Sequence, residues 1–185
     1  MLTPLDDLVD TIPHASLRKL TARALQEAPS SFWSAPASTS GKYHPADSLG
    51  IGGLLRHTRK VYHLTAALMA MEGTSRESIV YSVCLAAALL HDTHKVTLDS
   101  PHSHFDHPLR AARAVRTLLP EYPDIPHEAG EMLLHSISAH MGRWTTSKHE
   151  PDIVLPLPKS FAAKLVHTAD FLASRNFITL EPESV

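Results

Sequence analysis

Apolar residues recur every three to four positions over most of the chain, which is the period of a helix with one buried face. This pattern predicts helices over residues 5–12, 16–27, 53–72, 75–91, 108–119, 128–140 and 159–177. No pair of segments with alternating polarity predicts a β-hairpin. We therefore expect an all-α protein.

The helix predicted over residues 75–91 differs from the others, because its second half is apolar on every side. A helix of this kind is buried all round, so we place it at the centre of the bundle. Prolines and small polar residues predict loops over residues 30–50, 97–106, 120–126 and 141–158. No loop is long enough to divide the chain. We expect a single domain of residues 1–185, with a helical extension over residues 1–30 and a helical core over residues 51–177.

Composition narrows the class of protein. A chain of 185 residues can bury a core without disulfides, and its only cysteine, Cys84, excludes an internal one. A net charge of −2 argues against a basic protein that coats nucleic acid. No apolar run approaches the ~18 residues that span a bilayer, and the N-terminus lacks the apolar core of a signal peptide. We expect a cytoplasmic protein without a membrane partner, and the sequence predicts no oligomeric state.

Histidine is unusually frequent, with 14 residues against 7 glycines. His91 and Asp92 are adjacent at the end of the buried helix, His57 lies in the first turns of the 53–72 helix, and Asp170 lies beside the inward stripe of the last helix. Burying an unpaired carboxylate costs several kcal/mol, so Asp92 needs a cation or a metal beside it.

In this order, His57, His91-Asp92 and Asp170 resemble the H…HD…D signature of the HD-domain metal-dependent phosphohydrolases. The resemblance covers roughly residues 32–175. It implies an HD-domain helical bundle in which these four residues hold a divalent metal ion.

Three further histidines, His107, His135 and His140, follow the His-Asp pair. This pattern is similar to the HD domain of bacterial 3′–5′ exoribonucleases, and it implies a second ion bridged by Asp92. The chain departs from that branch in two ways. We expect no OB-fold, and the segment from residue 92 to residue 107 is short, so His102 or His104 could take the place of His107.

The resemblance also implies the chemistry. Imidazole and carboxylate ligands suit Mn²⁺, Fe²⁺, Co²⁺, Ni²⁺ or Zn²⁺, at one or two ions per chain. Asp92 and Lys95 are the catalytic candidates, with Lys95 placed as in the family's HDxxK form to contact a phosphate oxygen. The alternative for Lys95 is a solvated lysine at a helix C-terminus.

Three residues are candidates for substrate binding: His44, Arg143 and Trp144. Trp144 offers a face for a base to stack on and Arg143 a phosphate contact; a plain packed tryptophan beside a surface arginine is the alternative.

The predicted function is metal-dependent hydrolysis of a phosphodiester or phosphoester in a nucleotide or short oligonucleotide. Two alternatives remain open. One is a mononuclear nucleotidase or nucleoside triphosphate hydrolase, and the other is a non-catalytic HD-type module that binds nucleotides or nucleic acid.

Overall fold

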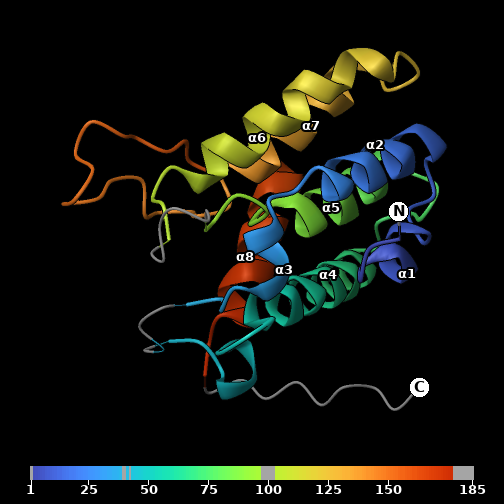
Figure 1. The fold of residues 1–185 in the computed structure, drawn as a ribbon. Coiled ribbons are helices and arrows are strands. Elements are labelled where there is room, and N and C mark those ends of the chain that lie inside the picture. Colours follow the sequence, from blue (N-terminus) through green and yellow to red (C-terminus); the bar gives the residue numbers. More distant parts are fainter. Residues whose placement is uncertain (1, 39–40, 42, 97–102, 177–185) are drawn as a thin grey trace.

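All regular structure is helical in residues 2–38, 41, 43–96 and 103–176, which are the residues described by the computed structural model (Figure 1). The helices are α1 (Asp6–Val9), α2 (Ala15–Gln26), α3 (Ser30–Ser34), α4 (Gly53–Met71), α5 (Ile79–Leu90), α6 (His107–Leu118), α7 (His127–Ser138) and α8 (Phe161–Ala173), with short 3₁₀ turns η1 (Ala46–Ser48) and η2 (Leu119–Glu121). The expected all-α bundle is confirmed.

Helix α5 is the centre of the bundle, as its apolar sequence predicts. Every residue from Tyr81 to Leu90 is buried, and α2, α4, α7 and α8 all pack against it (Figure 1). The helix begins later than expected because the Ser78 hydroxyl caps it, accepting a hydrogen bond from the Tyr81 backbone N–H. The C-terminal end of this helix delivers His91 and Asp92 into the interior.

The start of α4 depends on a close approach between backbones. Gly52 takes a left-handed conformation with φ of 70°. At Gly53 a Cβ atom would overlap the backbone carbonyl of Ser48, so only glycine lets η1 lie against the first turn of α4. This contact fixes the turn that carries His57.

The prediction of a continuous loop over residues 30–50 is wrong, because this stretch contains α3 and η1. Phe32 is fully buried in the main core, and the Ser31 hydroxyl donates to the Val96 carbonyl at 2.6 Å. Burial of Phe32 outweighs the weak helix propensity of its serine neighbours. Leu5, Leu17 and Leu20 are also fully buried in that core, so the first helices share it with the bundle.

Several boundaries differ from expectation. Helix α7 ends at Ser138, before His140, and α8 ends at Ala173, with residue 177 lying outside the described residues. Most of the segment expected to be irregular at 97–106, including His102, also lies outside them. Within the described part of the chain, no helix combines the length and the apolar character needed to cross a membrane.

Candidate metal centre

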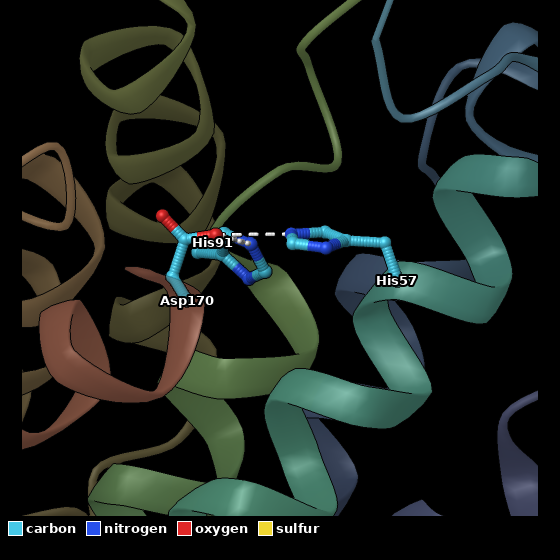
Figure 2. Close-up of side chains that lie close together, drawn as sticks. All are labelled: His57, His91 and Asp170. Atoms are coloured by element: carbon cyan, nitrogen blue, oxygen red, sulfur yellow. Dashed lines mark hydrogen bonds and ion pairs between the residues drawn. The ribbon is translucent and has the colours of Figure 1, made fainter. Parts of the chain in front are cut away.

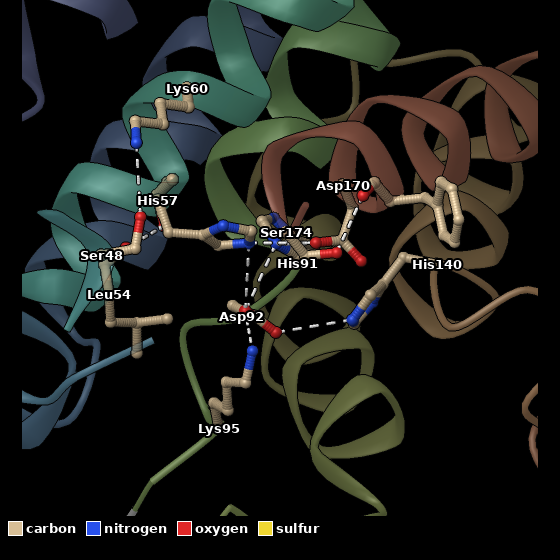
Figure 3. Close-up of polar contacts among 12 residues, drawn as sticks. Ser48, Leu54, His57, Lys60, His91, Asp92, Lys95, His140, Asp170 and Ser174 are labelled. Atoms are coloured by element: carbon tan, nitrogen blue, oxygen red, sulfur yellow. Dashed lines mark hydrogen bonds and ion pairs between the residues drawn. The ribbon is translucent and has the colours of Figure 1, made fainter. Parts of the chain in front are cut away.

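Asp92 lies at the middle of a buried polar cluster, and its two carboxylate oxygens face different histidines (Figure 3). Oδ1 lies 3.0 Å from His107 Nε2 and 3.4 Å from His140 Nε2. Oδ2 lies 3.5 Å from His91 Nε2 and 3.8 Å from His57 Nε2. A carboxylate placed in this way can bridge two sets of ligands.

Asp170 completes the cluster from α8. Its Oδ1 lies 3.0 Å from His57 Nε2 and 3.9 Å from His91 Nε2 (Figure 2). Two overlapping groups result, His57–His91–Asp170 and His91–Asp92–His140, and the ligand atoms of each lie within 4.8 Å of one another. The structure thus brings together the four residues of the H…HD…D pattern, which lie on three different helices or their ends.

Three of the histidines are oriented by the same local hydrogen bond to the backbone. Nδ1 of His91, His107 and His140 lies 2.8, 2.6 and 2.8 Å from the backbone carbonyl three residues earlier. A neutral imidazole carries one N–H, so donation from Nδ1 leaves the lone pair of Nε2 facing the cluster. This orientation of the ring is typical of metal-binding histidines.

The side of the cluster formed by His107, His140 and Asp92 Oδ1 has no cation among the described residues, because Lys95 lies on the other carboxylate oxygen, Oδ2. His107 Nε2 and His140 Nε2 lie 3.1 Å apart, and both lone pairs face Asp92 Oδ1. Neither His91 Nε2 nor Asp92 Oδ1 has a hydrogen-bond partner in the described residues, although both are buried. Because unsatisfied buried polar atoms are costly, a cation among these atoms would stabilise them. The residues present therefore fit a divalent metal.

The electrostatics hold His57 and His107 neutral and Asp92 ionised, which are the forms that bind metal, whereas His91 is shifted toward its protonated form. Burial lowers the pKa of His57 and His107, so both rings stay neutral. Burial opposes ionisation of Asp92, but the charges of Lys95 and His91 outweigh it and hold the pKa of Asp92 well below its usual range. Burial also opposes protonation of His91, yet Asp92 and Asp170 raise its pKa.

Lys95 points into the cluster, and its Nζ lies 2.7 Å from Asp92 Oδ2 (Figure 3). Its side chain is only 14% exposed, so the alternative of a solvated lysine is wrong. Burial favours the neutral amine, but Asp92 and Asp170 raise the pKa of Lys95 above its ordinary value. The site therefore contains a fixed positive charge.

His44 lies against the cluster from the segment before η1. Its ring packs edge-to-face on His57 with centroids 5.3 Å apart, and its buried Nδ1 has no hydrogen-bond partner in the part of the chain described. Burial is the main cause that lowers the pKa of His44 to about 4, and the charge of Lys95 acts in the same direction. A neutral imidazole with a free nitrogen therefore stands at the edge of the site.

His135 is the one expected ligand that the structure places elsewhere. Its Nε2 accepts a hydrogen bond at 3.1 Å from the backbone N–H of Lys159, and it belongs to neither ligand group. His135 lies within α7, whereas His140 follows the end of that helix, so the two rings point to different neighbours. His107 reaches Asp92 itself, and His104 supplies the carbonyl that orients it.

His167 supports the turn that carries His140, and the structure identifies the contact through which it does so. Its Nδ1–H donates to the His140 carbonyl at 2.7 Å, and its ring fills the space where a side chain on Gly142 would lie. It thereby fixes the turn that carries His140. Arg143 and Trp144 follow this turn on the surface, with Trp144 40% exposed.

The sequence model of the HD domain family matches residues 54–174, which is more than half of the chain. The matched segment contains every residue of the cluster except His44. Comparisons with curated protein sequences and with solved structures give no significant match.

Proposed function

The chain belongs to the HD domain family, whose members are in general metal-dependent phosphohydrolases, and from this premise we propose that it hydrolyses a phosphodiester or phosphoester of a nucleotide or short oligonucleotide. The observation that carries the proposal is the buried Asp92 carboxylate, whose two oxygens face separate sets of histidines. This arrangement supports two ions rather than one. A single ion held by the other ligands would leave His107 and His140 uncoordinated, although both face Asp92.

In this proposal His57, His91, Asp92 and Asp170 hold one divalent ion, and Asp92, His107 and His140 hold the second. When bound, the ions supply Lewis acidity and an ionised water at neutral pH. The chain offers no competing nucleophile in its only cysteine, because burial raises the pKa of Cys84 to about 12 and keeps the thiol protonated. A water nucleophile is therefore consistent with the residues present.

Lys95 and His44 would act on the substrate. The Lys95 ammonium can stabilise negative charge on a phosphate oxygen, since a fixed charge in a buried site is worth more than one in water. His44 stays neutral and can donate or accept one hydrogen bond at the edge of the cluster. Because His44 Nδ1 has no hydrogen-bond partner among the described residues, we assign that nitrogen to the substrate.

Hydrolysis of bis-p-nitrophenyl phosphate by metal-stripped protein with added Mn²⁺ tests this proposal. We expect turnover that Asp92→Asn reduces by roughly 10³-fold or more, because both ligand sets lose their shared carboxylate. His63→Asn is the matched control, since His63 is exposed on the same helix as His57. If the protein binds nucleotides but hydrolyses nothing with each of the five candidate metals in turn, the proposal of an enzyme is contradicted and the non-catalytic module is supported.

A further inference from the structure

Two arginines and three aromatic side chains contact one another in a continuous row at the surface of the protein. We call Arg143, Trp144, Phe171, Arg175 and Tyr43 the rim row. The Arg143 guanidinium lies 5.0 Å from the Trp144 ring centroid, and Trp144 stacks on Phe171 at 5.9 Å with an interplanar angle of 16°. The Arg175 guanidinium then lies 4.3 Å from Phe171 and 5.3 Å from Tyr43.

Each segment of the rim row is fixed beside a residue of the metal centre. Trp144 follows the turn that carries His140, Phe171 follows Asp170, and Tyr43 precedes His44. Asp170 is the most exposed of the six proposed metal ligands, at 18% of its side chain against 4% or less for the other five. The rim row therefore borders the part of the centre that solvent reaches.

The turn before Trp144 is built to hold this arrangement. Gly142 has a left-handed φ of 65°, and any side chain there would overlap the His167 ring. That ring contacts both aromatic members, with centroids 6.2 Å from Trp144 and 6.3 Å from Phe171. The stacking of Trp144 over α8 thus depends on a left-handed turn that glycine adopts without strain and other residues do not.

The chemistry of the rim row suits a planar, negatively charged ligand. Among the described residues, no carboxylate forms an ion pair with Arg143 or Arg175. Trp144 and Tyr43 are 40% and 51% exposed, which is unusual for large rings. Aromatic faces bind nucleobases by stacking, and guanidinium groups both stack on bases and pair with phosphates.

We propose that the rim row binds the nucleobase of the substrate by stacking on Trp144, and that Arg143 moves from this face to the adjacent phosphate. The inference rests on the proposed function for the identity of the reacting phosphate. Stacking on a ring face does not read hydrogen-bond patterns, so the site selects nucleotides over sugar phosphates and accepts every base.

Tryptophan fluorescence tests the proposal directly. Trp33 is the only other tryptophan, and Trp33→Phe leaves Trp144 as the sole reporter. With Zn²⁺ present, we expect AMP and UMP to quench the emission, whereas ribose 5-phosphate, which lacks a base, leaves it unchanged. Equal quenching by ribose 5-phosphate would overturn the proposal.

Calorimetric titration of variants in the wild-type background provides the second test. We expect Trp144→Ala to reduce the preference for AMP over ribose 5-phosphate by about tenfold, and Trp144→Phe to restore most of it. Arg143→Gln, an exposed change that spares the fold, should weaken AMP binding several-fold. An unchanged preference in Trp144→Ala would refute base stacking.

The two proposals fail separately. Quenching by AMP without hydrolysis of bis-p-nitrophenyl phosphate would refute the enzyme and support the rim row. Hydrolysis with no preference for AMP would support the enzyme and refute the rim row.

Discussion

At the scale of single residues, Asp92 and Lys95 determine what the site can do. The His-Asp pair is visible in the sequence because burying an aspartate at the end of an apolar helix needs a cation nearby. The position of Lys95 is less predictable, since a lysine at a helix end is usually solvated. Its burial against Asp92 at 2.7 Å became visible only in the structure.

Replacing Lys95 tests its role. We expect Lys95→Gln to lower kcat for phosphodiester hydrolysis by roughly 10²-fold, because a buried positive charge facing the substrate is lost. Metal content should not fall, since Lys95 offers no ligand while it is protonated. Lys164→Gln on the exposed face of α8 is the control. A kcat in Lys95→Gln equal to that of the wild type would disprove the assignment of Lys95 to charge stabilisation on the substrate.

At the scale of elements, periodicity predicts the long helices well and fails where tertiary contacts decide. Helix α3 could not be predicted, because two prolines and several serines surround it and it is stabilised by tertiary contacts, chiefly the burial of Phe32 and the Ser31–Val96 hydrogen bond. The prediction that His135 lies beside the second ion failed for a similar reason. Both His135 and His140 were expected near the second ion, but α7 ends between them and only His140 turns inward.

Replacing two helical glycines with alanine should change the stability of the protein in opposite directions. At Gly130 in α7, a Cβ would meet Leu119 at 3.5 Å, an ordinary contact, so Gly130→Ala should raise the free energy of unfolding by about 0.5–1 kcal/mol. At Gly53 a Cβ would overlap the Ser48 backbone, so Gly53→Ala should lower it by about 2 kcal/mol or more. Urea denaturation measures both. A neutral Gly53→Ala would show that η1 does not need to lie against α4.

At the scale of the whole molecule, the first helices share the main core with the bundle. The metal centre is formed by residues of α4, α6 and α8 together with residues that follow the ends of α5 and α7. The sequence predicts that His57, His91, Asp92 and Asp170 come together, because their order matches the H…HD…D pattern. It names Arg143 and Trp144 as binding candidates but does not predict the rest of the rim row, since stacking between Trp144, Phe171 and Arg175 depends on how the turn at Gly142 crosses α8.

Burial of neutral histidines makes the stability of the metal-free protein depend on pH. The pKa of His44 is about 4 in the folded protein against 6.5 in the unfolded chain, so its contribution is present above about pH 6.5 and is lost as the pH falls toward about 4. His57 and His107, whose pKa values are lowered by burial, act in the same direction. The raised pKa of His91 opposes them.

We therefore expect the urea midpoint in EDTA to fall over this range, and His44→Gln to show a shallower fall than the wild type. An identical pH dependence in the variant would show that His44 is not held neutral by the fold.

The central claim is that the buried histidines and aspartates form a metal centre, and metal content per chain tests it most directly. Untagged protein, reconstituted with a divalent transition metal and desalted, is measured by plasma mass spectrometry. We predict about two ions per chain in the wild type, about one in His140→Asn, and almost none in Asp92→Asn, since Asp92 serves both ligand sets. A wild type that retains no metal, or an Asp92→Asn variant that retains all of it, would contradict the account.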